Sequence, residues 1–143
     1  MSRSSQSGFT LIESMVVGIM VTVIGSMVIP QIQGVLSSYR LAASANLVAD
    51  ELNAGWVLAV STGSVHVVTI DGSDETIQIT DPNDSANIPR TEKPLQEGSS
   101  FSSWDPIRFY SRGLVDGGDI VIEDNFGETR TITITAGGEI TIN

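Results

Sequence analysis

Glu13 is the only charged residue between Gly8 and Pro30, a stretch whose other side chains are mainly apolar. A helix made of the 22 residues from Phe9 to Pro30 would be about 33 Å long, and the hydrocarbon core of a bilayer is about 30 Å thick. A carboxylate at that depth is costly, which makes it a functional hypothesis by default. We therefore predict a membrane-spanning helix over residues 9–30 with a functional carboxylate near its amino end.

The other residues that could do chemistry do not form a catalytic set. His66 is the only histidine, and because it alternates with Val65 and Val67 we expect its side chain to point outward from a strand. The chain has no cysteine, which excludes disulfide bonds and thiolate chemistry. We expect no enzymatic activity and no cofactor.

Two groups of acidic residues lie in predicted turns: Asp71, Asp74 and Glu75 form one, and Asp81 and Asp84 form the other. Calcium requires several oxygen ligands on a flexible loop, but neither group has the spacing of an EF-hand. We interpret both as solvated turn residues and expect no metal site.

The overall charge argues against a nucleic-acid partner. The chain has 7 basic and 17 acidic residues, and loss of Arg3 with a leader would change its net charge from −10 to −11. The basic residues of the last third are Arg108, Arg112 and Arg130, and the final turn has Glu139. Phosphate binding needs a basic surface, so we expect no specific binding to duplex DNA.

The segment before the apolar stretch is a short polar leader. Residues 1–8 contain one cation, Arg3, and end in the small residues Ser7 and Gly8. An ordinary secretory signal is cleaved after its apolar region, whereas these small residues precede it. Cleavage after Gly8 would leave the helix on the mature protein, with Phe9 as its new amino terminus.

This arrangement resembles the class III leader of type IV pilins and type II secretion pseudopilins. Gly8, Phe9 and Glu13 stand where those families have the cleavage glycine, the methylated first residue and the fifth-position glutamate, and Pro30 stands where many members have a helix-bending proline. The resemblance implies cleavage by a prepilin peptidase between Gly8 and Phe9, N-methylation of Phe9, and a role for Glu13 in setting register during filament assembly.

Charge pairing gives Glu13 a physical role in such an assembly. Cleavage would create an ammonium group at Phe9, at the same membrane depth as the Glu13 carboxylate. Within one chain the two groups compensate poorly, because the helix amino terminus points away from its own side chains. The amine of a staggered neighbouring subunit could pair with Glu13 and relieve the cost of an unpaired buried charge.

Small residues recur at every fourth position of the apolar stretch. A face of such residues lets helices approach closely in lipid, and chance is the alternative explanation. Gly25 and Pro30 weaken the helical hydrogen bonds, so a kink is expected near them. The residues of this face are Ser14, Gly18, Thr22 and Ser26.

We predict that the helix continues as an amphipathic segment over residues 31–63 and stops at Thr62-Gly63. Two apolar stripes on nearly opposite faces suggest two packing partners. The first, which we expect to pack on other subunits, is Ile32, Leu36, Tyr39, Ala43 and Leu47. The second, which we expect to dock on the protein's own domain, is Leu41, Ala45, Val48, Leu52, Trp56 and Ala59.

Residues 64–143 are predicted to form a β-rich domain without helices. Period-two patterns separated by Gly turns indicate antiparallel strands, and residues 81–105 are predicted to be a long loop whose end is pinned by Phe101 and Trp104. The strands are expected at Val65–Ile70, Thr76–Thr80, Ile107–Tyr110, Asp119–Glu123, Thr129–Thr135 and Glu139–Ile142. The last 37 residues resemble the β-domain of GspH/FimT-type minor pseudopilins.

The resemblance implies an α+β, pilin-like lollipop with four parts: the cleaved leader 1–8, the membrane and filament-core helix 9–30, the amphipathic continuation 31–63 and a periplasmic domain 64–143. It implies a single-pass inner-membrane subunit whose partners are the prepilin peptidase and other pseudopilins or pilins. A minor pseudopilin of a type II secretion system is the first interpretation. The alternative is a FimT-like minor pilin of a type IV pilus, acting in pilus biogenesis, adhesion or DNA uptake.

Overall fold

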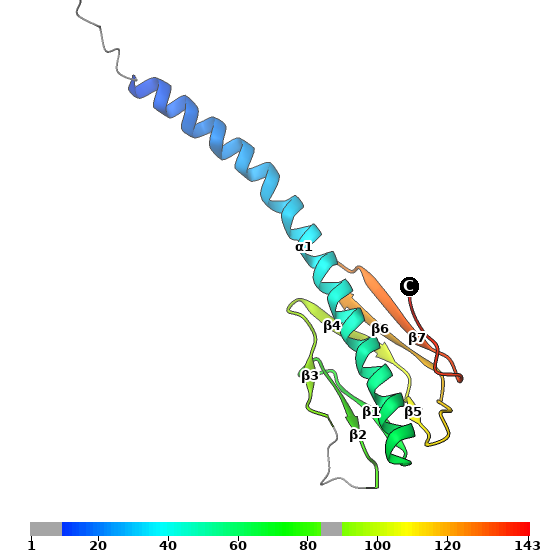
Figure 1. Cartoon of the computed structure of the whole chain (residues 1–143). Helices are drawn as coiled ribbons and strands as arrows, with labels where there is room; N and C mark the ends of the chain where they lie inside the picture. Colours follow the sequence, from blue (N-terminus) through cyan, green and yellow to red (C-terminus); the bar gives the residue numbers. More distant parts are fainter. Residues whose placement is uncertain (1–9, 84–89) are drawn as a thin grey trace, which may run out of the picture. The chain divides into compact units, whose positions relative to one another are not determined.

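The computed structural model describes residues 10–83 and 90–143, and for residues 27–31 it describes the backbone alone. The chain divides into two compact units, Met1–Val35 and Leu36–Asn143. One helix, α1, runs from Leu11 to Thr62 and contributes to both units (Figure 1).

Both ends of α1 have recognisable caps. Thr10 is the N-cap: its hydroxyl oxygen accepts a hydrogen bond from the Glu13 N–H at 3.3 Å, which satisfies one of the free donors of the first turn. At the other end Gly63 has φ = +70° and donates its N–H to the Ala59 carbonyl at 3.1 Å. A left-handed glycine is the common helix stop, so the predicted end at Thr62-Gly63 is confirmed.

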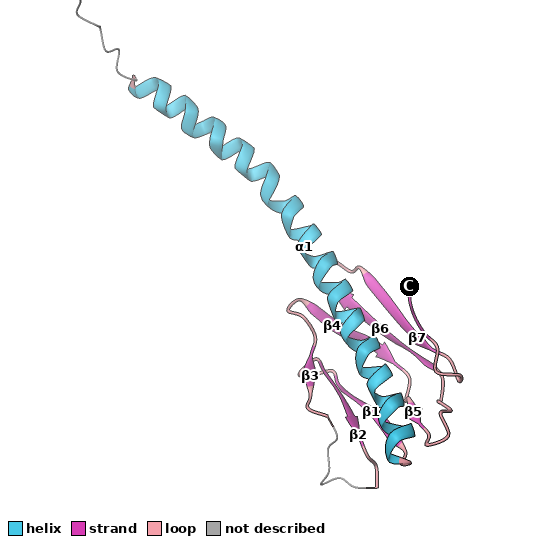
Figure 2. Ribbon diagram, viewed as in Figure 1, coloured by secondary structure: helices cyan, strands magenta, loops and turns pink. Residues whose placement is uncertain are grey.

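The second unit contains two antiparallel sheets, shown in Figure 2 with α1 crossing them. The first has the order β3-β2-β1-β5 and the second the order β4-β6-β7-β8. The first sheet consists of β1 (His66–Asp71), β2 (Thr76–Thr80), β3 (Lys93–Pro94) and β5 (Arg108–Phe109). The second consists of β4 (Ser99–Trp104), β6 (Gly118–Asp124), β7 (Thr129–Ile134) and β8 (Ile140–Ile142).

One apolar core joins α1 to both sheets. Alternate side chains of β2, β6 and β7 point inward, as expected for half-buried strands, and the core is completed by residues of the connecting segments. From α1 it receives Leu41, Ala45, Val48, Leu52 and Ala59, and from the sheets Ile77, Ile79, Phe101, Phe109, Ile120, Ile122, Ile132 and Ile134. The predicted docking stripe is therefore confirmed at five of its six positions.

Trp56 is the exception and corrects the prediction for that stripe. Its side chain is 37% exposed, and its indole N–H donates to the Gly113 carbonyl at 2.9 Å. Gly55 faces the core in its place: a Cβ there would lie 2.6 Å from Cε2 of Phe109. The aromatic ring that packs against Gly55 is Phe109 of β5, and Trp56 lies at the rim of the core.

The prediction of an unbroken loop over residues 81–105 is also wrong, because this stretch contains β3 and β4. β4 reads Ser-Ser-Phe-Ser-Ser-Trp, and serine gives little strand signal; the strand forms through pairing with β6. Phe101 is buried as expected, while Trp104 remains 43% exposed and meets Phe101 edge-to-face, with ring centroids 6.1 Å apart.

His66 points inward, contrary to the expectation from its neighbours. It is 2% exposed, and its Nδ1 lies 3.3 Å from the Ser64 carbonyl oxygen. In β1 the inward positions are His66, Val68 and Ile70, so Val67 lies on the outer face of the strand. Pairing of His66 with the core residue Phe109 decides this orientation.

Candidate assembly surface

The amino-terminal part of α1 exposes large apolar side chains on every side. Residues 15–17 and 19–21 supply consecutive apolar positions, and since successive helical residues differ by about 100°, such runs surround the helix. The exposed side chains run from 47% for Val16 to 82% for Leu11; they are Leu11, Ile12, Met15, Val16, Val17, Ile19, Met20, Val21, Val23 and Ile24. A helix that is apolar all round is normally buried in protein or lipid.

Glu13 lies in the first turn of this helix and is exposed. A carboxylate in the first turn interacts favourably with the helix dipole, and no side chain in the described part of the chain covers it. The processing residues Gly8 and Phe9 lie outside the described residues, so the cleavage and the Glu13–Phe9 pairing remain predictions.

The predicted small-residue face has its hydroxyl groups satisfied within the helix. Ser14 donates to the Thr10 carbonyl at 3.4 Å, Thr22 to the Gly18 carbonyl at 2.8 Å, and Ser26 to the Val23 carbonyl at 2.8 Å. These hydroxyls therefore need no water to satisfy them, which lowers the cost of covering this face with an apolar partner.

Gly18 opens a shallow apolar groove on the same face. No atom lies within 4 Å of the position that its Cβ would occupy, and the groove is lined by Met15, Gly18, Ile19, Thr22 and Val23. Such a notch admits a side chain or the backbone of another helix, in keeping with the predicted packing role.

The side chain of Pro30 lies outside the described residues, although the helical backbone of α1 continues across this position. Proline has no N–H, so the Ser26 carbonyl lacks its usual helical donor. The kink at Pro30 remains a prediction.

In the parts of the chain that the structure describes, no helix is both long enough and apolar enough to cross a bilayer. The predicted span over residues 9–30 is therefore not confirmed by the structure.

An ion pair between a buried carboxylate and a half-buried guanidinium anchors the start of the segment that leads to β3. Glu51 of α1 is 3% exposed, and its two oxygens accept hydrogen bonds from Nε and Nη2 of Arg90, each at 2.7 Å. The hydrogen bonds to the Glu51 carboxylate are the main reason that the pKa of Arg90 is raised above its ordinary value.

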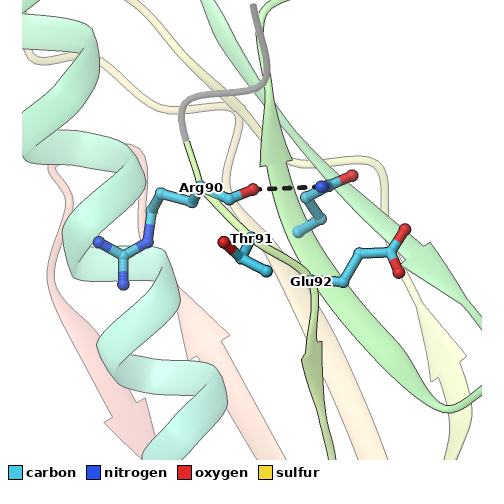
Figure 3. Close-up of a pocket in the computed structure, with 4 residues that line it drawn as sticks. Arg90, Thr91 and Glu92 are labelled. Carbon is cyan, nitrogen blue, oxygen red and sulfur yellow. Dashed lines mark hydrogen bonds between the residues drawn. The ribbon is translucent and has the colours of Figure 1, made fainter.

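The hollow beside this pair is lined by Gln78, Arg90, Thr91 and Glu92 (Figure 3). Gln78 donates its side-chain N–H to the Arg90 carbonyl at 3.1 Å, and the Arg90 guanidinium is directed toward α1. Because the guanidinium and the amide are already engaged, these four residues offer no catalytic set.

The acidic turn residues act as acceptors for backbone N–H groups. Asp71 accepts the N–H of Ser73 at 2.8 Å, and Asp81 accepts the N–H of Asn83 at 2.8 Å. Glu75 accepts the N–H of Phe101 at 2.7 Å. Asp84 lies outside the described residues, and among those described no three metal-ligating side chains come together.

Two turns hold α1 at residues 37–40, a contact that the sequence did not predict. From the β6–β7 turn, Asp124 accepts a hydrogen bond from the Ser37 hydroxyl at 2.6 Å, and Glu128 accepts one from Ser38. From the turn before β4, Glu97 forms an ion pair with Arg40 at 3.8 Å. We call these contacts the collar.

Asp124 is the central residue of the collar and is 7% exposed. The Ser37 hydroxyl, followed by backbone N–H donors of the turn, lowers the pKa of this carboxyl below its usual value despite the opposing effect of burial. Hydrogen bonds to a carboxylate favour its charged form, so the turn is built around an ionised Asp124.

The structure is similar to two kinds of solved protein, although no family model and no curated protein matches the sequence. Two structures of the minor pseudopilin EpsH from the type 2 secretion system of Vibrio cholerae match with TM-scores of 0.58 and 0.57, at 18% and 16% identity. They cover 73% and 72% of this chain, and 96% and 92% of EpsH. The type IV minor pilin FimU of Pseudomonas aeruginosa matches with a TM-score of 0.58 at 16% identity, over 74% of this chain and 90% of FimU.

The chain has a pilin-like fold. A long helix packed on antiparallel β-sheets is the α+β arrangement that the sequence predicted, so the fold class is confirmed. At such low identity the likeness is one of fold. Because a pseudopilin and a pilin match equally well, the pilin-like fold does not separate type II secretion from a type IV pilus.

Proposed function

We propose that this protein is a minor pseudopilin, a structural subunit of the pseudopilus of a type II secretion system. The observation that carries the proposal is a helical segment with apolar side chains exposed on all sides and a single carboxylate, in a chain with a pilin-like fold. Such a segment requires burial, and assembly with similar helices provides it. The function is structural, and no catalytic step is involved.

The proposed life cycle begins in the inner membrane. The prepilin peptidase cleaves between Gly8 and Phe9, and Phe9 is methylated. The apolar segment over residues 9–30 anchors the protein in a single pass, with the β-domain in the periplasm. Arg3 ahead of the segment supports this orientation, since cations favour the cytoplasmic side.

Assembly then transfers the helix from lipid to a bundle of neighbouring helices. Glu13 pairs with the Phe9 amine of an adjacent subunit, which compensates both charges where solvent is absent. The groove at Gly18 and the internally bonded hydroxyls of Thr22 and Ser26 allow close approach of a partner helix.

The second candidate is a minor pilin of a type IV pilus, and the likeness to FimU supports it as much as the likeness to EpsH supports the first. Leader, helix and fold would serve either assembly. A DNA-uptake version is disfavoured by the net charge of −10, because duplex DNA repels an acidic surface.

Photocrosslinking in the native host tests both candidates. With p-benzoylphenylalanine at Val21, an apolar position of the helix that is 64% exposed, we expect capture of pilin-like neighbours. Their identity as secretion or pilus subunits selects between the candidates. Capture of lipid alone in assembling cells would refute the proposal.

Intact mass of the native protein tests the processing step separately. We expect a mature chain that begins at methylated Phe9. A protein that retains Met1–Gly8 while the host peptidase is active would contradict this step.

A further inference from the structure

The β6–β7 turn, residues 124–128, is held rigidly by hydrogen bonds from within and from outside. The Asp124 carboxylate accepts the N–H of Phe126 at 2.9 Å and that of Glu128 at 2.8 Å. Gly127, with φ = +82°, donates its N–H to the Asp124 carbonyl at 3.1 Å. The turn conformation is therefore specified by one buried carboxylate and one left-handed glycine.

The collar fixes this turn to α1. Asp124 is bonded to Ser37 and Glu128 to Ser38, and the turn lies beside α1 in Figure 1. On its other side the turn approaches Gly98: a Cβ placed there would lie 3.2 Å from Nδ2 of Asn125. The turn thus has support from the helix and from the segment before β4.

Phe126, at the centre of this rigid turn, is 67% exposed. The hydrogen bond that Phe126 makes in the turn uses its backbone N–H and not its ring. Because the ring is mostly exposed, packing within the domain gives no reason for an aromatic side chain at this position. A large aromatic side chain on a preorganised support loses little conformational entropy when it binds. Aromatic residues of this kind are the usual anchors of protein interfaces.

The charges around Phe126 indicate the chemistry of its partner. The turn and the segments beside it carry the carboxylates of Glu97, Glu123, Asp124 and Glu128 and the guanidinium groups of Arg40 and Arg130. Arg40 pairs with Glu97 at 3.8 Å and Arg130 pairs with Glu128 at 3.7 Å, which leaves an excess of two carboxylates, Glu123 and Asp124. The resulting negative charge disfavours an anionic lipid surface, and a second copy of this chain would bring the same acidic groups. A protein surface with cations around an apolar socket complements it.

We propose that the β6–β7 turn is a docking knob, in which Phe126 inserts into an apolar, basic-rimmed socket on a different pilin-like subunit. The inference rests on the proposed function, because it names a contact in the same assembly. It places this contact on the β-domain, separate from the helix–helix packing of residues 11–26.

Photocrosslinking of the full-length protein in its native host tests the knob. The variant Phe126→p-benzoylphenylalanine is compared with the same replacement at Leu114, an apolar residue that is 60% exposed. We expect position 126 to capture a non-identical pilin-like subunit, with cationic residues at the crosslinked site, at a yield at least about tenfold above position 114. Capture of a second copy, of lipid alone, or at the yield of position 114 would overturn the proposal.

The crosslinker at Val21 separates this proposal from the proposed function. If Val21 captures pilin-like neighbours while position 126 does not, the knob is wrong and the function stands. If neither captures them, both are wrong.

Truncation of the ring supplies a second readout. We expect Phe126→Ala to lower co-purification of the partner about tenfold, in the range of interface hot spots, and Phe126→Tyr to retain it. Leu114→Ala is the matched control and should leave co-purification unchanged. Equal co-purification by Phe126→Ala and wild type at matched protein levels would refute the knob.

Discussion

At the scale of single residues, the Glu13 carboxylate is the one charge among the apolar side chains of the amino-terminal helix. Glu13 is exposed in the isolated chain, next to large apolar side chains that require burial. Burying those side chains in an assembly also buries Glu13, and an unpaired buried charge is strongly destabilising. We therefore propose that the carboxylate favours assemblies that bring a cation to it.

We predict that Glu13→Leu leaves leader cleavage and membrane insertion nearly intact but blocks efficient assembly. A central acid costs about 2.5–3.5 kcal/mol on insertion scales, so the variant should insert at least as well as wild type. Loss of one member of a buried pair costs about 3–5 kcal/mol, roughly two to four decades in an association constant. The measurement is crosslinking to filament partners at matched membrane levels, with Glu13→Asp as the control. Unchanged incorporation of Glu13→Leu would show that the carboxylate does not mediate assembly.

A second residue-scale prediction concerns Asp124, whose folded-state pKa is lowered mainly by the Ser37 hydroxyl. A carboxyl with a lowered pKa stabilises the fold above its unfolded pKa, and this contribution is lost as the pH falls through the lower, folded value. Asp124→Asn should therefore reduce the free energy of unfolding most near neutral pH, and the difference from wild type should shrink below about pH 4. Urea unfolding across this range measures it. Glu139→Gln serves as the surface control, and a difference for Asp124→Asn that does not depend on pH would contradict the assignment.

At the scale of elements, the contact between α1 and β5 depends on a missing side chain. A Cβ at Gly55 would lie 2.6 and 2.9 Å from two carbons of the Phe109 ring and 3.1 Å from Cδ1 of Ile79. At distances under 3 Å the Phe109 ring or the backbone of one of the two elements must shift. Glycine at position 55 lowers the helix propensity of α1 but allows the helix to approach the sheet closely.

We predict that Gly55→Ala destabilises the domain by about 1–3 kcal/mol, as overpacked core substitutions do, despite alanine's better helix propensity. Gly137→Ala is the matched control, because its nearest neighbour would be 3.8 Å away. Thermal unfolding of both variants measures the effect. A Gly55→Ala variant as stable as wild type would show that the contact between α1 and β5 does not depend on the missing side chain.

At the scale of the whole molecule, all core residues among those described belong to the same compact unit. The unit Leu36–Asn143 contains the core stripe of α1, both sheets and the collar. The amino-terminal unit contributes no core residue among those the structure describes. The core of the unit Leu36–Asn143 therefore needs no side chain from the described part of the amino-terminal unit.

We predict that a fragment starting at Ser37 folds as a soluble monomer with both helix and strand signals in circular dichroism. It retains the complete core and the Ser37–Asp124 hydrogen bond. A fragment starting at Ala54 is the control, since it lacks Leu41, Ala45, Val48 and Leu52 and should not fold cooperatively. A Ser37 fragment with only helix, or only coil, would contradict the division into two units.

Local sequence patterns determined those elements whose ends are marked by their own residues. The end of α1 at Thr62-Gly63 was predictable because a left-handed glycine stops a helix wherever it occurs. The strands β6 to β8 were predictable because alternating isoleucines and glycine turns give a period of two. The leader over residues 1–8 and the role of Glu13 rest on the same kind of local pattern, charge and hydropathy at the amino end, and they remain predictions.

Tertiary structure alone decided the features that depend on residues far apart in the chain. The serine-rich β4 forms because β6 pairs with it, His66 turns inward because β5 lies beside it, and Trp56 is displaced because Phe109 fills its place. The Glu51–Arg90 pair and the Ser37–Asp124 contact join residues 39 and 87 positions apart. No local pattern can specify such contacts, because each contact forms only after the fold has brought Arg90 or Asp124 to its partner on α1.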